Sequence, residues 1–495
     1  MENPLLLGPI FIPLAAAVLG LALSRYNRAQ RALGVVAGGL AWVCSLILLA
    51  QALDQGVQTY TMGGWTAPFG IILVADRLAA LFAAMSTTVV GGGLLYAYHC
   101  HDKVINRPAF TSLFLTMGAG LVGCLYTGDL FTLFVFLELM VIASVLLVAI
   151  SDNPLGLEAA IKYLFISAMG TLFLLLGVAA MYATFGTLNM ADIARVLATG
   201  ERPFLATEAA VMLLCAFLLK SAVFPFHFWQ PDFHTTAPTP VHAVLSSVVV
   251  KVGVYGVIRM LTLLFTEEAA VIQNILIVLG LIGIFFGSLG ALRTYDAKRM
   301  LAYSTFGQIG FILVAIGWGN PAALVGALVY AVNHSFIKSS LLMLTGVVSS
   351  RTQTKTARLT EIAGVGKHLA LTNALYLLGG LALAGVPPLN GFISKLALVR
   401  GGIAAESWAV LGLAVGAGMI TLLYMTRTWQ LMFQRKPDET TAPLKDYGDS
   451  PYAPLLLVGL CVVFGIYAAP LLEVAALTVS ELAQPEIYIN AVFGR

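Results

Sequence analysis

The sequence predicts an all-α polytopic membrane protein with about fourteen transmembrane helices, arranged as two inverted five-helix repeats with two broken helices. Three observations predict this class: the composition, a series of long apolar runs, and basic residues that alternate between loops. Of 495 residues, 59% are hydrophobic and only 10% are charged, against about 25% charged in ordinary soluble domains. A soluble fold of this length exposes a polar shell that this composition cannot fill. We therefore expect the chain to use lipid as its solvent.

Long apolar runs mark the expected spans. A helix of about 20 apolar residues crosses a bilayer core, and in lipid a helix satisfies its own backbone polar groups. Runs of this kind cover residues 4–23, 32–52, 77–98, 109–127, 129–150, 158–185, 207–229, 238–265, 269–290, 298–317, 321–348, 370–399, 404–433 and 451–472. The first run has no basic residues before it, so we interpret it as a retained span and not a cleaved signal.

Basic residues in the loops orient the chain, because loops rich in Lys and Arg stay on the cytoplasmic side. Loops after odd-numbered runs carry Arg25, Arg28, Arg31, Lys103, Arg107, Arg293, Lys298, Arg299, Arg351, Lys355, Arg358, Lys367, Arg435, Lys436 and Lys445. Loops after even-numbered runs carry few, such as Arg195 and Arg202. The alternation supports the count of spans and predicts that both termini lie outside.

Two stretches between the runs are too polar to span. Residues 54–75 combine Gly, Thr and aromatic residues and predict a small external hairpin, and residues 189–198 predict a short amphipathic helix on the outer surface. The chain then divides into residues 1–108 (spans one to three with the hairpin), 109–265 (first five-helix repeat), 269–433 (second, inverted repeat) and 434–495 (a loop and the last span).

Several function classes are not expected. A net charge of only +3 argues against a nucleic-acid partner. None of the five cysteines forms a CxxC pair, which argues against an iron–sulfur site or a disulfide framework. The triplet His99-Cys100-His101 lacks further ligands for a metal. We therefore expect no cofactor and no metal.

Five ionisable residues lie well inside predicted spans: Glu138, Lys220, Lys251, Lys338 and Lys395. A charge at the centre of a span costs about 2.5–3.5 kcal/mol on insertion scales. A buried lysine beside a glutamate can act as a switch, holding its proton when paired and releasing it when separated. The simpler alternative is one structural ion pair with the other lysines reaching toward the membrane surface. That alternative is weakened because one acid cannot neutralise four lysines.

Histidines extend this set. His334 precedes Lys338 by one helical turn, so the two share a helix face and His334 is a candidate for proton transfer. His242 lies near the start of the run that carries Lys251, and we class it with His227 and His234 as a candidate relay residue. Arg259 falls near the end of a run, where an arginine is usually an interfacial anchor.

Proline and glycine predict two broken helices. Pro225 follows Lys220 by five residues, and Gly385, Pro387, Pro388 and Gly391 precede Lys395. Proline removes a backbone donor and obstructs the helix, and membrane helices tolerate such breaks where they line a cavity. The breaks fall in the seventh and twelfth runs, so the fourth to eighth and ninth to thirteenth runs form two five-helix units. An odd number of helices inverts one unit relative to the other.

Three stretches carry a family resemblance. They are FPFHFWQPDFHTTAPTPVHAVLSSVVVKVGVYGVIR at 224–259, KRMLAYSTFGQIGFI at 298–312 and GVPPLNGFISKLALVRG at 385–401. They resemble the antiporter-like subunits shared by respiratory complex I, membrane-bound hydrogenases and Mrp-type cation/proton antiporters. The resemblance implies fourteen helices in two inverted repeats. It also implies that Glu138 of FLELM and the lysines at 220, 251 and 395 lie on a proton path.

The length of the chain and Lys395 are most similar to the D subunits of Mrp antiporters, whereas HTTAPTPVH is nearer the complex I and hydrogenase relatives. The resemblance thus implies a proton-translocating subunit of a multisubunit Na+/proton antiporter in a bacterial plasma membrane, partnered by other membrane subunits and not an enzyme by itself. The alternative is a proton-pumping subunit of a complex-I-type oxidoreductase or membrane-bound hydrogenase. A passive assembly scaffold is a third hypothesis, in which neutralising the buried charges changes stability more than flux.

Overall fold

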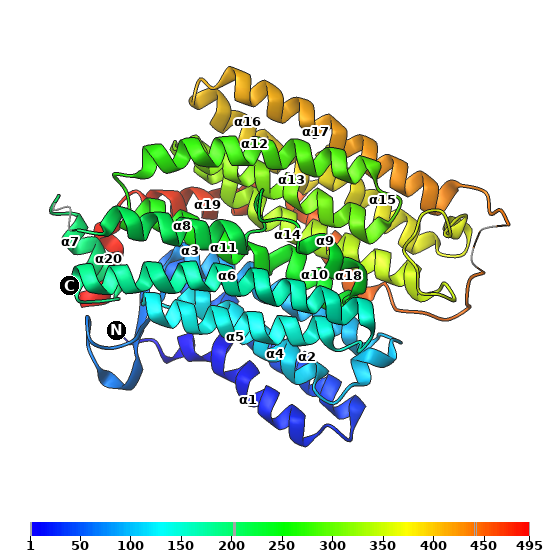
Figure 1. Cartoon of the computed structure of the whole chain (residues 1–495), viewed down its shortest axis with the longest axis horizontal. Coiled ribbons are helices and arrows are strands. Elements are labelled where there is room, and N and C mark those ends of the chain that lie inside the picture. Colours follow the sequence, from blue (N-terminus) through cyan, green and yellow to red (C-terminus); the bar gives the residue numbers. More distant parts are fainter. Residues whose placement is uncertain (1, 201–203, 440, 442, 495) are drawn as a thin grey trace.

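Helices running side by side along one axis make up nearly the whole of the computed structural model (Figure 1). The structure describes every residue except 1, 201–203, 440, 442 and 495, so Arg202 lies outside the described residues. Within them, ten helices are long and apolar enough to cross a membrane, or eleven when one bent pair counts as a single span. The chain is therefore a multi-pass membrane protein, as its composition predicts.

The elements follow the predicted runs closely in most of the chain. The first half contains η1 (Pro4–Leu7), α1 (Gly8–Ala22), α2 (Asn27–Asp54), β1 (Gln58–Thr61), η2 (Met62–Gly64), β2 (Ile72–Ala75), α3 (Arg77–Tyr98), η3 (Lys103–Asn106), α4 (Phe110–Tyr126), α5 (Leu130–Ala149), α6 (Pro154–Phe185), α7 (Met190–Leu197), α8 (Ala206–Lys220), α9 (Gln230–Thr236), α10 (Thr239–Val244), η4 (Leu245–Val249), α11 (Val250–Arg259) and η5 (Met260–Leu264).

The second half contains α12 (Ala269–Arg293), α13 (Ala297–Gly317), α14 (Pro321–Ser350), η6 (Val365–Lys367), α15 (Ala370–Ala384), α16 (Asn390–Ala404), α17 (Trp408–Trp429), η7 (Gln430–Gln434), α18 (Tyr452–Ile466), α19 (Ala469–Leu482) and α20 (Pro485–Phe493). The elements η4, η5 and η7 are π-helical turns that continue their neighbouring α-helices.

Side-chain caps fix where several long helices begin. A cap oxygen accepts a hydrogen bond from a backbone amide of the first turn that would otherwise have no partner. Such caps precede α3, α5, α6, α13 and α14, and are provided by Asp76, Asp129, Asn153, Asp296 and Asn320. The local sequence therefore sets the starting point of each of these helices.

The two predicted breaks are present. The helix α8 ends at Lys220 and α9 begins only at Gln230, on the far side of Pro225. The helix α15 ends at Ala384 and is capped by Gly385, whose φ of +85° suits glycine, and α16 begins at Asn390. Each break leaves helix ends inside the bundle beside a lysine.

The extent of the last predicted span, 451–472, is wrong. The apolar segment continues to Leu482 as two helices, α18 and α19, bent by 80°. Pro470 lies in the first turn of α19, where its missing amide is tolerated, but a proline cannot continue the helix before it. The short helix α20 follows and contacts α7.

The predicted hairpin and short amphipathic helix are also present. β1 and β2 pair antiparallel, with Gln58 opposite Ala75, and α7 covers residues 190–197 of the predicted stretch. The hairpin, α7, α20 and both termini lie at the same end of the bundle, at the left of Figure 1. The basic loop at residues 351–369 lies at the opposite end, together with residues 435–439 and 443–451.

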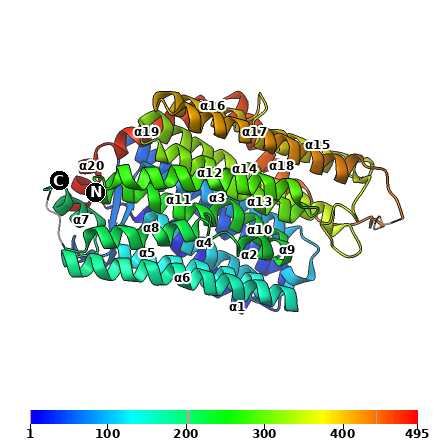
Figure 2. The ribbon, with the colours of Figure 1, turned by 45° about the horizontal axis from the view of Figure 1, so that its top comes forward.

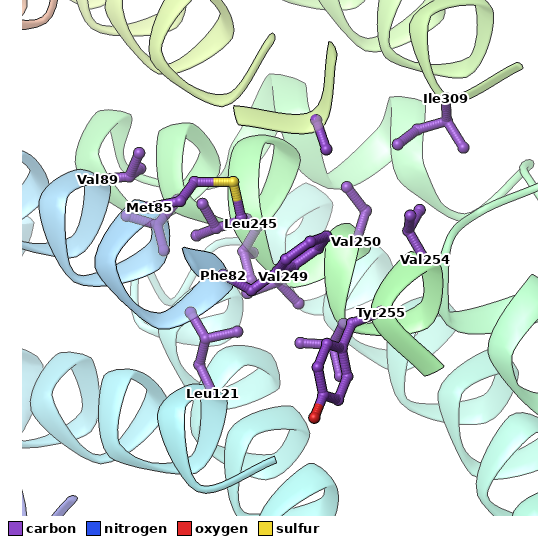
Figure 3. Packing of buried hydrophobic residues seen from close by; sticks show 14 of the residues in the cluster. Phe82, Met85, Val89, Leu121, Leu245, Val249, Val250, Val254, Tyr255 and Ile309 are labelled. Carbon is purple, nitrogen blue, oxygen red and sulfur yellow. The ribbon is translucent and has the colours of Figure 1, made fainter. Parts of the chain in front are cut away.

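The core lies around α3, α10, α11, α13 and α14. The span from Thr239 to Leu264 and the helix α14 are buried over the whole of their most apolar windows, whereas only 33–39% of the corresponding windows of α2, α6, α12 and α17 is buried. Phe82 and Met85 of α3 pack against Leu245 and Val249 of η4 (Figure 3). Two views place α17 on one side of the bundle and α1 on the other, with α14 between them (Figures 1 and 2). Charges on the central helices are therefore enclosed by protein.

Candidate functional site

The predicted pair of Glu138 and Lys220 is brought together by α6. Lys220 Nζ lies 3.9 Å from Glu138 Oε1. Thr171 bridges them: Lys220 donates to Thr171 Oγ1 at 3.1 Å, and Thr171 donates to Glu138 Oε1. Lys220 also donates to Ser167 Oγ at 2.7 Å and to the Ser167 carbonyl at 3.1 Å. Thr171 and Ser167 are four residues apart and so present one face of α6 to the lysine.

The two members of this pair differ in burial. The Lys220 side chain is 6% exposed, whereas the Glu138 side chain is 28% exposed on a face of α5 that is otherwise apolar. A small cavity of about 10 Å³ beside Lys220 is bounded by Ser167 and by Val249 of η4, and has room for about one water. The cavity thus touches both Lys220 and Val249, which precedes the next lysine, Lys251, by two residues.

Lys251 sits directly after a π-helical turn. Within such a turn the regular i+4 backbone partner is lost, which opens a carbonyl to side-chain donors. The Ser247 carbonyl accepts from Lys251 Nζ, and from Ser335 Oγ of α14 at 3.0 Å. The π-turn therefore positions the lysine and ties α11 to α14.

Lys338 and His334 lie on α14 beside Lys251. Lys338 Nζ donates to the Leu301 carbonyl at 2.8 Å and to Ser304 Oγ of α13 at 2.9 Å. His334 is within electrostatic range of both lysines, and neither of its ring nitrogens has a hydrogen-bond partner among the described residues. These three side chains are no more than 1% exposed. Over the described part of the chain, neither lysine forms an ion pair, and backbone carbonyls and the Ser304 hydroxyl are their hydrogen-bond partners.

His234 of α9 and His242 of α10 form a second buried group, with ring centroids 5.9 Å apart. Among described residues none of their four ring nitrogens makes a hydrogen bond of normal geometry. Residues 235–239 between them line a cavity of about 660 Å³ that is also bounded by Lys298. His234 is within electrostatic range of Lys338 and Lys298. The pair thus lies between this cavity and Lys338.

His227 is separate from that pair. Its ring stacks on Phe224 and meets the edges of Phe286 and Phe306, at centroid distances of 5.4, 4.4 and 5.1 Å. The structure therefore places this candidate relay residue in an aromatic pocket.

Lys395 reaches back across the break in its own helix. Its Nζ donates to the carbonyl of Ala384, the last residue of α15, at 2.5 Å, and lies 5.9 Å from the centre of the Phe311 ring. The C-terminal end of a helix carries a partial negative charge that favours a cation. The break thus supplies Lys395 with a partner where no carboxylate lies near among the described residues.

Hydroxyl and amide side chains fill the spaces between the lysines, and the sequence reasoning missed them. Ser304 Oγ lies 2.9 Å from the Tyr424 hydroxyl. Asn333, next to His334, donates to Ser394 Oγ at 2.9 Å in the helix that carries Lys395. Serine and threonine within spans usually bond their own helix backbone, so no sequence signal separated these residues from the rest.

Arg259 is not an interfacial anchor, which corrects the expectation from sequence. It is 5% exposed and forms a two-bond ion pair with Asp76 of the α3 cap. It does lie near the end of a span, but the fold covers that end with α3, α19 and α20. Elsewhere in the described residues, no three His, Cys, Asp or Glu side chains are grouped to hold a metal, and the five cysteines are unpaired.

Ionisable side chains buried across the middle of a multi-pass bundle are typical of membrane proteins that move ions. The chain belongs to the NADH:quinone oxidoreductase/Mrp antiporter transmembrane family, whose model matches residues 127–421. This membership confirms the family resemblance.

Three similar proteins illustrate the breadth of the family. The chain is 30% identical to the D subunit of the Na+/H+ antiporter of Alkalihalophilus pseudofirmus over 493 residues, or 99% of each chain. It is 35% identical to the N subunit of the NADH-quinone oxidoreductase of Desulforudis audaxviator over 426 residues, or 85% of this chain and 83% of the relative. A chain in the structure of the Mrp complex from Dietzia sp. superposes with a TM-score of 0.90 at 23% identity, covering all of both chains, and so shares the fold.

Proposed function

We propose that the chain is the proton-translocating subunit of a multisubunit antiporter that exchanges Na+ or another monovalent cation for protons. Its partners are the other membrane subunits of that complex, and its location is a bacterial plasma membrane. The match to the D subunit of an antiporter over 99% of both chains supports this assignment. The observation that carries it is the bridged contact between Lys220 and Glu138, followed by lysines with no carboxylate partner among the described residues.

In this proposal protons move along Glu138, Lys220, Lys251, His334, Lys338 and Lys395. While Glu138 is charged, it favours the charged form of Lys220 through Thr171. When that contact opens, Lys220 passes its proton toward Lys251 through water in the small cavity beside Val249. His334 interacts electrostatically with both Lys251 and Lys338 and so links these two lysines. His234 and His242 exchange protons with water in the cavity of about 660 Å³. His227, which lies among aromatic rings, has a secondary role in this proton path.

We further propose fourteen spans in two inverted five-helix units, residues 109–265 and 269–433, flanked by 1–108 and 434–495. Counting α4, the two broken helices and the bent pair with the ten long helices gives fourteen. Both termini lie at one end of the bundle, as an even number of crossings requires. The fourth member of each unit is broken and carries a lysine, which supports a common origin for the two units.

The alternative, a proton-pumping subunit of a complex-I-type oxidoreductase or membrane-bound hydrogenase, is favoured by the 35% identity to the N subunit of an oxidoreductase. That match covers less of the chain than the antiporter match does. The two functions differ in what drives the proton: a cation gradient in one, and electron transfer in the other.

One experiment separates them. The assembled complex is purified with its native partners and reconstituted in proteoliposomes, and proton movement is followed with a pH-sensitive dye. The antiporter proposal expects a Na+ or K+ gradient to move protons without any electron donor. Bound flavin or iron in the purified complex, together with proton movement only during electron transfer, would establish the alternative.

A further inference from the structure

A polar stripe runs along α11 from its buried lysine to the end of the bundle where the termini lie. Lys251, Tyr255 and Arg259 are each four residues apart, so they occupy one face of the helix. All three are buried. This stripe joins the middle of the protein to the outer end, and it is not part of the path proposed above.

Arg259 is held on every side at that outer end. It donates to Asp76 Oδ2 at 2.5 Å and to Asp76 Oδ1 at 2.8 Å, and also to the Tyr255 hydroxyl at 3.0 Å. The guanidinium lies between two aromatic rings, 5.2 Å from the centre of Tyr255 and 5.1 Å from the centre of Tyr488. The side chains of Arg259 and Asp76 are only 6% and 3% exposed.

The Tyr255 hydroxyl is occupied as well. It accepts from Arg259 and donates to the Leu125 carbonyl of α4 at 2.7 Å. Its ring packs 5.7 Å from that of Phe82, and Val250 and Val254 lie alongside (Figure 3). The hydroxyl points away from these apolar side chains in the same view. Its one proton is thus committed to a backbone carbonyl, which is not a proton carrier.

The neighbouring ion pair of Arg77 and Glu481 holds helix ends together. Arg77 donates to the carbonyls of Ala52 and Leu53 at the end of α2 and to Leu477 of α19. Its backbone amide donates to Glu481 Oε1 at 3.0 Å. Arg77 and Glu481 therefore join helix ends, and they provide a matched comparison for the buried pair next to them.

An outer cavity brings solvent close to this region. It measures about 320 Å³ and is bounded by Ile258 and Thr262, on either side of Arg259 in sequence, and by Leu482 beside Glu481. Arg259, the outer member of the polar stripe, therefore lies between two residues of the cavity wall in sequence.

We propose that Arg259, Asp76 and Tyr255 form the outer seal of the proton path, closing the route along α11 between the outer aqueous phase and Lys251. An arginine keeps its proton in proteins, so Arg259 cannot pass one inward. The ion pair and the two tyrosine rings occupy the space that a chain of water would need. The seal rests on the proposed proton path, because a seal matters only if Lys251 exchanges protons.

The test measures passive proton leak of the assembled complex in proteoliposomes, under a K+ diffusion potential and with no exchanged cation present. Arg259→His puts a side chain that exchanges protons near neutrality in place of one that does not. We expect the passive leak to rise on the order of tenfold, because the electrostatic and steric barrier is removed. Arg259→Lys keeps a charged, proton-retaining group and is expected to leak less than Arg259→His.

Arg77→His is the matched control, since it changes the same residue type in the adjacent ion pair. We expect weaker assembly from that variant but a leak close to that of the unaltered complex. An assembled Arg259→His complex that stays as tight as the unaltered one overturns the proposal, and so does an equal leak from Arg77→His. If Arg259→His does not assemble, Tyr255→Phe provides the test, because it removes one hydrogen-bond partner of the guanidinium. We then expect the passive leak to rise about two- to threefold. An unchanged leak overturns the proposed seal.

This readout is independent of exchange activity. Lys220→Ala tests the proposed function through cation-driven flux, whereas the leak is measured without that flux. Failure of the proposed function would therefore appear as normal exchange in Lys220→Ala, and failure of the seal as unchanged leak in the Arg259 and Tyr255 variants.

Discussion

Lys220 and Glu138 meet through a shared hydroxyl: Lys220 Nζ lies 3.9 Å from Glu138 Oε1, and Thr171 Oγ1 is hydrogen-bonded to both. Removing one partner of a buried, directly bonded ion pair typically costs about 3–5 kcal/mol, which makes such a pair a poor switch. A contact that passes through a rotatable hydroxyl can open with a smaller change. The geometry thus suits a proton carrier that is repeatedly paired and released.

Removing either partner should abolish most exchange. We expect Lys220→Ala and Glu138→Gln each to lower cation-driven proton flux at least tenfold while the complex still assembles, because a proton carrier or the charge that tunes it is lost. Lys162→Ala is the control, since Lys162 is 47% exposed and pairs with Glu158 and Asp232 at the protein surface. Normal flux in assembled Lys220→Ala would refute its assigned role.

The bridging hydroxyl should matter on its own. Thr171→Val keeps the shape of the side chain but removes the donor to Glu138 and the acceptor for Lys220. We expect roughly a tenfold slower flux, equivalent to about 1.4 kcal/mol, and a displaced pH optimum. Thr171→Ser restores the hydroxyl and should restore both. Equal flux in the Val and Ser variants would show that the pair works without the bridge.

Lys395 should behave as Lys220 does. Its ammonium is held by the end of α15 and by Phe311, so Lys395→Ala leaves the break intact but removes the proton carrier. We expect flux to fall at least tenfold with assembly preserved. His99→Ala is the comparison, because this loop histidine contacts its own helix end and nearby tyrosines, and flux should be unchanged. Normal exchange by the Lys395→Ala complex would show that the proton path does not include Lys395 of α16.

Cys100 should be a slow nucleophile. Burial, and then the Asp449 carboxylate, raise the pKa of this loop thiol well above its usual range. The thiolate is the reactive form, so alkylation at pH 8 should be much slower than for a free thiol and should accelerate only at higher pH. Asp449→Asn removes the negative charge, which lowers the pKa and speeds alkylation at the same pH. Maleimide labelling of a chain whose other cysteines are replaced by alanine measures both rates, and a wild-type rate equal to that of a free thiol would contradict the assignment.

Gly391 should be required for the second break. A Cβ at this position would overlap the Ala382 carbonyl of α15. Gly391→Ala therefore forces the two half-helices apart, and we expect less assembled complex and a melting temperature several degrees lower. Gly412→Ala is the control, because nothing lies within 4 Å of an added Cβ there among the described residues. The two variants can be compared by size-exclusion chromatography and thermal unfolding, and equal behaviour would mean that the break tolerates a side chain.

Much of the architecture follows from local sequence. Pro225, and Pro387 with Pro388, predicted breaks that the structure contains. The strands of residues 54–75 and the short helix α7 were predicted from composition alone. Proline, glycine and apolar length act on the chain within one or two helical turns, so their effects can be predicted without a fold.

Other features depended on partners distant in sequence. The position of Arg259 in the chain indicates an anchor, but α3 brings Asp76 to it. The hydroxyls of Thr171 and Ser304 have no sequence pattern that marks them as lysine partners. The bend between α18 and α19 was missed although Pro470 lies inside the predicted run 451–472, and that run ends ten residues before α19 does.

The sequence by itself determined that this chain spans a membrane, where the two lysine-bearing helices break, and which charges the lipid environment makes expensive, because these depend on composition and on nearest neighbours along the chain. Only the tertiary structure decided which of those charges meet, since helices far apart in sequence supply the hydroxyls, carbonyls and carboxylates that face each lysine and arginine. A bilayer fixes the depth of a side chain, but packing against other helices fixes its partner.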